Sequence, residues 1–434
     1  MLATRRGPVP VRWRIAILLS MSYMVWFMDR VNISVAGPTM MKYFNWTAAD
    51  FGLVQSAFFV GYAFTQIPGG WLADRFGGSK VVLLGTLWWS LFVFITPFGA
   101  TLALMMAIRA SMGVGEGVNA PAHVALTAWW MPKKESGRAI GVYYIGMQVG
   151  IMITMPLTVW IIGTYGWQMC FFSFAFVGVA WSALWYWYGC DRPEQHRSIS
   201  EEELAYIKSD RDDAEVMEQP TDWKTLFTNK LVWGLAISYF FNNYLFYLYI
   251  TWLPGYLVID RGFTLVKTGV FAMLPYMVSI ITSPLGGYLS DYWTKKYGAH
   301  IGRSLPIQLG LAGSCIFLVL GAYTSNPYAA VAYICASVGF LNMNFGPYWS
   351  AALTLSAKDG GVIGGLMNTL GTVAGIIAPA VTGFIVTASG NKFEWALYFG
   401  AFLALLGVIV IGVAGRVRPI EFAKPAPEEK AALI

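Results

Sequence analysis

Long apolar segments recur along the whole chain, and they constrain its fold more than any other feature. Three of the clearest are residues 15–35, 81–98 and 401–413. A helix that crosses the hydrocarbon core of a bilayer needs about 20 predominantly apolar residues. Only 12% of the residues are charged, whereas a soluble chain carries about 25%. The sequence therefore predicts an all-α membrane protein with many spans.

Prolines, glycines and charged clusters divide the chain into about twelve spans. Their predicted starts lie near residues 13, 52, 80, 102, 138, 167, 230, 265, 303, 327, 361 and 394. An even number of spans places both termini on the same side of the membrane. The segments on that side hold 23 of the 29 Lys and Arg residues, which indicates that both termini are cytoplasmic. We expect a multi-pass protein of a bacterial inner (cell) membrane, surrounded by lipid and without a nucleic-acid partner.

The polar stretch 190–229 separates two halves of similar length. We predict a six-helix bundle over 1–189, a cytoplasmic linker over 190–229, and a second six-helix bundle with a short cytoplasmic tail over 230–434. Within the linker, Ser200 and Glu203 have the spacing of a capping box, which favours a short amphipathic helix. A mixed-charge run follows at 210–213.

A short motif recurs in the two halves. Residues 65–74 read TQIPGGWLAD and residues 282–291 read TSPLGGYLSD, at an offset of half the chain. A duplicated six-helix unit is typical of transporters, with the substrate site between the two copies. We expect Asp74 and Arg75 to cap helix ends and to tie them together on the cytoplasmic side.

Residues 70–80 closely resemble the loop signature of the major facilitator superfamily, and residues 287–296 resemble it more loosely. Three further stretches, 29–34, 109–122 and 191–200, are similar to the anion:cation symporter family within it. The resemblance implies twelve transmembrane helices in two pseudosymmetric six-helix bundles and transport by alternating access. It also implies a role in gating or in the loop motif for a set of residues, namely Gly70, Asp74, Arg75, Gly77 and Asp291. In one departure, Phe27 stands where sugar-acid members often carry Tyr.

Four charged residues lie inside apolar spans: Asp29, Arg30, Arg109 and Glu116. A charge at the centre of a bilayer costs about 2.5–3.5 kcal/mol on insertion scales, so its default interpretation is functional. Arg109 and Glu116 are seven residues apart and share a helix face. Depth along the helices places both arginines in the outer half of the membrane, where two guanidinium groups suit an organic anion. Gly113 is expected to leave open space beside Arg109.

The two acids are expected to have a different task. Burial disfavours an ionised carboxylate and a nearby guanidinium favours it, so protonation can depend on whether an anion occupies the arginine. The resemblance implies that Arg30 and Arg109 bind the anion, that Glu116 is the principal proton carrier, and that Asp29 is a second coupling acid. The alternative is that the four residues form two neutral salt bridges that only hold helices together.

The second half of the chain offers neutral polar groups in place of charges. We predict that Asn368 in the second half and Gln148 in the first half contact the substrate. Trp349 and, from the first half, Tyr62 are predicted to form aromatic walls. Helix packing is the alternative for each of these residues. His123 could relay protons, bind phosphate, or simply pack at a helix end. Gly146 and Gly150 have the spacing of small residues that permit close helix contact.

These features predict a proton-coupled symporter that brings a small organic anion into the cytoplasm, with a sugar acid such as a hexonate or hexuronate as the leading substrate. Aromatic carboxylates and inorganic phosphate are the alternative substrates, and an exchanger, a uniporter or a membrane sensor are the alternative functions. The sequence has no phosphate-binding loop, metal cluster or nucleophile elbow, which argues against an enzyme. We expect no metal or cofactor, with the proton as coupling ion. A monomer is expected.

Overall fold

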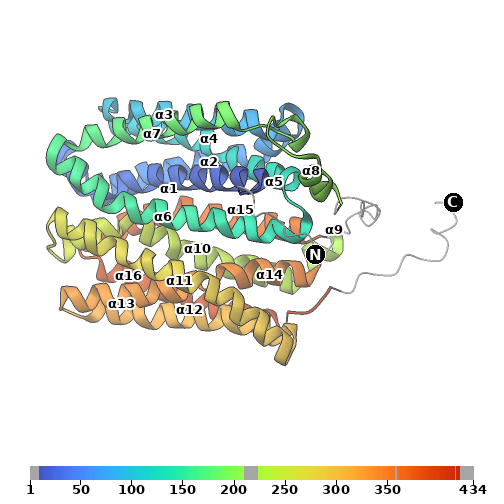
Figure 1. Ribbon diagram of the computed structural model, residues 1–434. Helices are drawn as coiled ribbons and strands as arrows, with labels where there is room; N and C mark the ends of the chain where they lie inside the picture. Colours follow the sequence, from blue (N-terminus) through green and yellow to red (C-terminus); the bar gives the residue numbers. More distant parts are fainter. Residues whose placement is uncertain (1–8, 210–222, 357–358, 416, 421–434) are drawn as a thin grey trace.

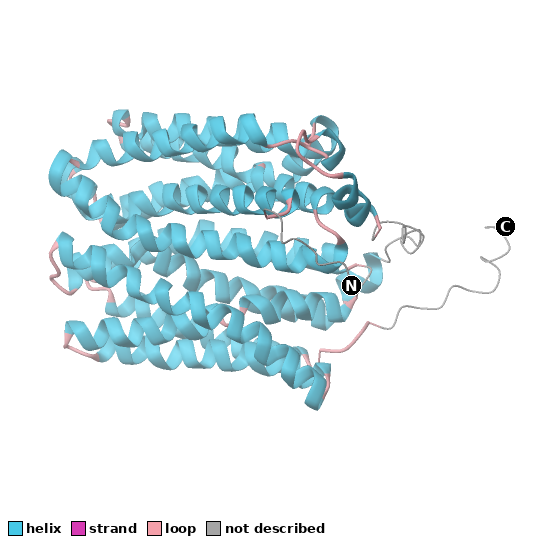
Figure 2. Ribbon diagram, in the orientation of Figure 1, coloured by secondary structure: helices cyan, strands magenta, loops and turns pink. Residues whose placement is uncertain are grey.

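The computed structural model describes residues 9–209, 223–356, 359–415 and 417–420. Almost all of them belong to long helices that run side by side along one common direction (Figure 1). The described residues contain no strand (Figure 2). The mixed-charge run at 210–213 and the tail after residue 420 lie outside the described residues.

Each half of the described chain crosses the bundle six times. The passes of the first half are α1 (Val11–Phe44), α2 (Ala48–Phe76), α3 (Gly78–Ile95) with η1 (Thr96–Phe98), α4 (Leu102–Gly117) followed by α5 (Asn119–Trp130), α6 (Lys133–Tyr165) and α7 (Trp167–Tyr188). The passes of the second half are α10 (Lys230–Gly255) with η4 (Tyr256–Asp260), α11 (Leu265–Tyr297), α12 (Ala299–Tyr323), α13 (Pro327–Asn342) followed by α14 (Phe345–Leu355), α15 (Gly360–Ala388) and α16 (Glu394–Ala414). Between the halves lie η2 (Pro193–Gln195), α8 (Glu201–Lys208) and α9 (Trp223–Thr228). The predicted all-α, twelve-span fold is confirmed.

Nine helical segments of the described chain are long and apolar enough to cross a membrane. The three remaining passes are α2, α4 with α5, and α10. The pass formed by α4 and α5 is divided into two short helices of 16 and 12 residues. α10 carries polar and aromatic residues and is buried along most of its length. A helix that packs against other helices does not need a uniformly apolar surface, which accounts for the weaker membrane signal of α10.

The two bundles contact each other most extensively along three helix pairs: α2 with α15, α6 with α11, and α1 with α10. We call the end of the molecule where α8 lies the linker end (Figure 1). On α6 the face that carries Gln148 contacts the second bundle, but Gly137 and Gly141 on the same face have no neighbour within 4 Å. On α15 the face that carries Asn368 contacts the first bundle, but Gly361 on the same face has no neighbour within 4 Å. The bundles therefore pack together away from the linker end and separate towards it.

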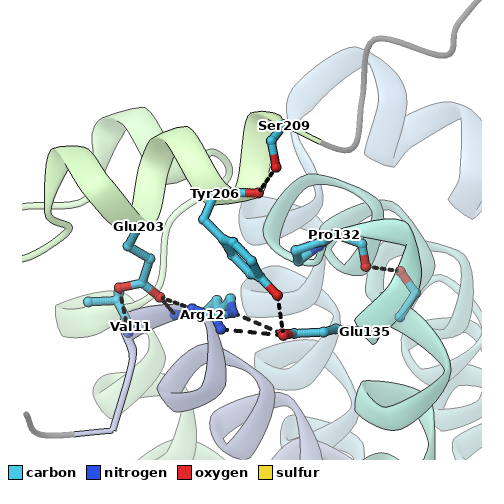
Figure 3. A network of polar contacts seen from close by, with 8 residues as sticks. Val11, Arg12, Pro132, Glu135, Glu203, Tyr206 and Ser209 are labelled. Carbon is cyan, nitrogen blue, oxygen red and sulfur yellow. Dashed lines mark hydrogen bonds and ion pairs between the residues drawn. The ribbon is translucent and has the colours of Figure 1, made fainter. Parts of the chain in front are cut away.

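A network of ion pairs fixes α8 to the ends of α1 and α6 (Figure 3). Arg12 lies 2.9 Å from the Glu135 carboxylate and 3.1 Å from that of Glu203. Glu203 also accepts hydrogen bonds from the backbone N–H groups of Val11 and Arg12, at 3.0 and 3.1 Å. Tyr206 donates its hydroxyl hydrogen to Glu135 at 2.8 Å. Ser200 caps α8 as its spacing predicts, but the Glu203 side chain caps α1 instead of completing a capping box.

Replacing Glu203 by alanine should therefore destabilise the first bundle. The change removes the acceptor of two N–H groups at the start of α1 and one of the two carboxylates on Arg12, a loss on the order of 1–2 kcal/mol. Thermal unfolding of the purified protein would show it as a lower Tm. Glu202→Ala is the matched control, because Glu202 is exposed on the same turn. Equal Tm values for the two variants would contradict the assigned role of Glu203.

The loop between α2 and α3 is held by a residue from the end of the first bundle. Asp191 accepts a hydrogen bond from the Ser79 backbone N–H at 2.6 Å, at the start of α3. Gly77 has φ +94°, and a Cβ there would collide with the Asp191 carboxylate. Glycine is therefore required at position 77 both by its backbone conformation and by this contact. Two separate motifs of the sequence, 70–80 and 191–200, thus meet in space.

The predicted tie through Asp74 and Arg75 is corrected. Both residues are exposed near the end of α2, which continues to Phe76, and no ion pair of either is found among the described residues. Arg75 instead lies over the ring of Trp71, at 5.3 Å from its centroid. Gly70 is not tightly packed either, since a Cβ there would be 3.8 Å from its nearest neighbour. In the second half the tie is made, because Asp291 on α11 pairs with Arg303 on α12 at 2.7 Å.

Candidate functional site

A buried ion pair joins α1 to α4. Arg30 is 8% exposed and Glu116 is fully buried, and the Arg30 Nε donates to Glu116 Oε2 at 2.7 Å. The indole N–H of Trp26, one turn before Arg30, donates to the same oxygen. The other carboxylate oxygen, Oε1, has no hydrogen-bond partner among the described residues. One oxygen of Glu116 thus receives two donors while the other receives none.

Aromatic rings surround the Arg30 guanidinium. Its central carbon lies between 4.7 and 5.7 Å from five ring centroids, those of Trp26, Phe27, Phe58, Phe59 and Tyr62. Aromatic faces stabilise a cation and exclude water from it. The predicted wall residue Tyr62 is the nearest of the five, at 4.7 Å. Arg30 is therefore held in place by ring faces as well as by Glu116.

Arg109 is a buried cation without a carboxylate partner. It is 1% exposed, and no ion pair to it is found among the described residues. Its Nη1 lies 2.8 Å from the Met112 sulfur, which is only a weak acceptor, and its Nε has no partner. Its guanidinium lies 5.2 Å from the centroid of Phe58, the same ring that Arg30 contacts at 4.9 Å. The two arginines therefore converge on one aromatic ring, as the depth estimate predicts.

Asp29 faces away from this cluster. It is fully buried, and its Oδ2 accepts a hydrogen bond from the Trp89 indole on α3 at 3.0 Å. Successive helical residues differ in direction by about 100°, so Asp29 points into the first bundle while Arg30 points towards α4.

The alternative that the four charged residues form two neutral salt bridges is wrong. Among these four residues only one ion pair is made, that between Arg30 and Glu116.

The predicted contacts Gln148 and Asn368 join the two bundles. Gln148 donates to Asn342 at 3.2 Å, and Asn368 donates to Gln66 at 3.1 Å. Trp349 packs against Gly364 and lies 6.4 Å from the ring of Tyr239. None of the contacts described for these three predicted residues reaches Arg30 or Arg109.

Sequence reasoning missed Trp26 and Tyr247. Trp26 precedes Arg30 by one helical turn, so helical spacing could have placed it on the same face. Tyr247, on α10, packs against Phe59 with ring centroids 4.5 Å apart and lies near Arg30. Tyr247 therefore brings a residue of the second bundle to the ion pair. No pattern in the sequence indicates that contact, because it depends on how the bundles meet.

Two further expectations concern α4 and α5. Gly113 does not leave open space beside Arg109, because a Cβ there would collide with the backbone of Phe58 and Tyr62. The glycine instead lets α4 pack closely on α2.

His123 is buried and its Nδ1 lies 2.7 Å from the Asn119 backbone oxygen, so Nδ1 carries the hydrogen. Its ring packs edge-on against Tyr23 at 5.1 Å. No group of three or more His, Cys, Asp or Glu side chains that could hold a metal occurs in the described part of the chain.

Comparisons with known proteins agree with this architecture. The family model described as "Major Facilitator Superfamily" matches residues 15–379. The chain is 33% identical to the probable sulfoacetate transporter SauU of Cupriavidus necator and 31% identical to the probable galactarate/D-glucarate transporter GudP of Bacillus subtilis. Each alignment covers 92% of both chains. Among solved structures, a bacterial homologue of the human lysosomal transporter Spinster, in an inward-facing and occupied conformation, superposes with a TM-score of 0.78. It has 16% identity and covers 97% of this chain and 100% of that one.

Proposed function

The chain belongs to the major facilitator superfamily, and we propose that it imports a small organic anion together with protons by alternating access. A sugar acid such as a hexonate or hexuronate is the leading substrate. The membership makes the protein a transporter and not an enzyme. One observation carries the proposal, namely that Arg109 is a buried cation with no carboxylate partner in the described part of the chain, beside the Arg30–Glu116 pair.

The distribution of Lys and Arg supports an orientation in which the linker end faces the cytoplasm. We place the protein in a bacterial inner membrane, as a monomer with both termini cytoplasmic. In this orientation the separation of the bundles at the linker end corresponds to a site open to the cytoplasm. The contacts of Gln148 and Asn368 between the halves then lie on the substrate's path, and their amides would exchange partners for hydroxyl groups of a sugar acid. Tyr62 and Trp349 would form apolar walls.

Coupling follows from competition for Arg30. An incoming carboxylate binds the unpaired Arg109, and it can also bind Arg30 only by displacing Glu116. A carboxylate that loses its cation in a buried site takes up a proton. The Oε1 oxygen of Glu116 has no hydrogen-bond partner among the residues that the structure describes, so it can accept that proton while Oε2 still receives the Trp26 hydrogen bond. The anion and the proton are therefore bound together. Asp29 is proposed as a second titrating acid.

The names of the relatives help to choose the anions for a test. Sulfoacetate, galactarate and glucarate each carry two acidic groups, which would match two arginines. Uptake into proteoliposomes under an inward proton gradient should be compared for galactonate, glucuronate, galactarate, sulfoacetate, phthalate and phosphate. We expect gradient-stimulated uptake of at least one sugar acid. Stimulated uptake of phthalate or phosphate alone would favour the alternative substrates, and no stimulated uptake of any anion would refute symport.

A further inference from the structure

A groove lies between α1 and α7 on the outer surface of the first bundle, at the linker end. α1 begins and α7 ends there (Figure 1), and the Trp181 indole on α7 donates to the Leu18 backbone oxygen on α1 at 3.0 Å. Ile17 is 47% exposed and Trp187 is 75% exposed. Because α7 packs mainly on helices of its own bundle, the open side of the groove faces the surrounding lipid. The groove has a volume of about 250 Å³ and is lined by Arg14, Ile17, Leu18, Leu184, Trp187 and Tyr188.

One end of the groove carries a half-buried cation, Arg14, with no acidic partner in the described part of the chain. Its Nε donates to the Val9 backbone oxygen at 2.8 Å, and its Nη1 donates to the Tyr188 hydroxyl at 3.4 Å. Neither a hydrogen bond of its Nη2 nor an ion pair of Arg14 is found among the described residues. The two carboxylates of the linker-end network are paired with Arg12 instead. Neutral oxygen atoms therefore hold Arg14 in place, while its charge and one terminal nitrogen stay available to an anion.

The rest of the groove is apolar and runs towards the middle of the membrane. Arg14 lies in the first turn of α1, and Leu18 follows it by about 6 Å along the helix axis. Leu184 precedes Tyr188 by one turn on the antiparallel α7, so it lies at a depth similar to that of Leu18. Tyrosine and tryptophan are enriched at the level of the lipid headgroups, which is where the lining residues of α7 end. The groove is thus cationic at the membrane surface and apolar below it, in the order of a phospholipid headgroup and its acyl chain.

We propose that this groove binds an anionic phospholipid from the leaflet at the linker end, with the phosphate on Arg14 and one acyl chain beside Leu18 and Leu184. A guanidinium presents a planar fork of N–H donors that fits a phosphate, and basic pockets between membrane helices bind anionic headgroups. A zwitterionic lipid brings a second cation next to the arginine and fits less well. The bound lipid contacts the first and the last span of the first bundle, so it should stabilise that bundle. The proposal requires only that the chain lies in a membrane, and it is independent of the proposed function.

Native mass spectrometry of the purified full-length protein with added dioleoyl phosphatidylglycerol tests the site. We expect the protein to retain phosphatidylglycerol more tightly than dioleoyl phosphatidylcholine. Arg14→Gln should weaken the binding of phosphatidylglycerol about tenfold, which corresponds to the loss of one charge-assisted contact. Arg192→Gln is the matched control. Arg192 is also an arginine near the linker end of α7 and lies 4.4 Å from the centroid of the Trp129 ring, but it does not line the groove, so its loss should leave the lipid affinity unchanged.

Three results would overturn the proposal. The first is equal affinity of the wild-type protein for the two lipids, and the second is equal affinity of Arg14→Gln and Arg192→Gln for phosphatidylglycerol. The third is displacement of phosphatidylglycerol by soluble glycerol phosphate at similar concentrations, because the site would then hold a free phosphate and not a lipid. A readout on the wild-type protein alone guards against variants that fail to fold: phosphatidylglycerol should raise the Tm more than phosphatidylcholine does, and equal shifts would count against the site.

Discussion

Replacing Arg109 by glutamine is expected to abolish high-affinity anion binding without lowering the thermal stability of the protein. Arg109 makes no ion pair with any residue that the structure describes, and its guanidinium lies against the Met112 sulfur and the Phe58 ring. Its removal therefore eliminates an uncompensated buried charge and breaks no ion pair. A charge-assisted hydrogen bond to the substrate is worth about 1.5–3 kcal/mol, which corresponds to a roughly 10- to 150-fold increase in Kd. Isothermal titration with the best anion, together with thermal unfolding, measures both effects.

The matched variant is Arg30→Gln. It leaves the Glu116 carboxylate buried without its cation, and breaking a buried pair in this way costs about 3–5 kcal/mol. The two variants should therefore differ clearly in stability although both lose anion affinity. If Arg109→Gln is as unstable as Arg30→Gln, then Arg109 has a structural partner and is not the free anion-binding group. If Arg109→Gln binds the anion as the wild-type protein does, its assignment to the anion site is wrong.

Glu116→Gln should abolish proton-driven accumulation while it spares counterflow. A glutamine carbonyl oxygen can occupy the place of Oε2 and accept the hydrogen bonds of Trp26 and Arg30, so these contacts are kept although Arg30 loses its counter-charge. The amide cannot take up or release a proton, so the anion can still exchange across the membrane but cannot be concentrated by a pH gradient. Uptake of labelled anion should be measured in proteoliposomes with a pH gradient and, separately, with unlabelled anion trapped inside.

Glu135→Gln serves as the control for that measurement. Glu135 is also paired with an arginine, Arg12, but it lies in the network at the linker end (Figure 3). Accumulation driven by the pH gradient should persist in this variant. If it persists equally in Glu116→Gln, the proton is carried elsewhere and the assigned role of Glu116 is refuted. If counterflow is also lost in Glu116→Gln, the residue is needed for binding and not only for coupling.

The fold could be predicted because its determinants are local. The length of the apolar segments and the breaks between them mark the passes, and the spacing of Ser200 to Glu203 marks the start of α8. The repeated motif reports the duplication of six helices. Each of these signals depends on residues that are near one another in the chain. The burial of all four charged residues could be predicted for the same reason.

The pairing within the site could not be predicted, because it depends on how neighbouring helices are rotated and how closely they pack. The spacing of Arg109 and Glu116 fixes their shared face but not which arginine reaches the acid, and the long side chain of Arg30 reaches it from α1. Gly113 shows the same limit, since only the position of α2 decides whether a glycine leaves space or removes it. The outward direction of Asp74 likewise depends on where α2 ends.

The central claim is that the anion and the proton move together through the site around Glu116. It is tested most directly by the reverse of proton-driven uptake: an inward gradient of the transported anion is applied to proteoliposomes at equal pH on both sides, and the internal pH is followed with a trapped dye. The account predicts that the lumen acidifies in the wild-type protein as the anion enters and that Glu116→Gln shows no acidification. Entry of the anion at the wild-type rate with no change in internal pH would contradict it.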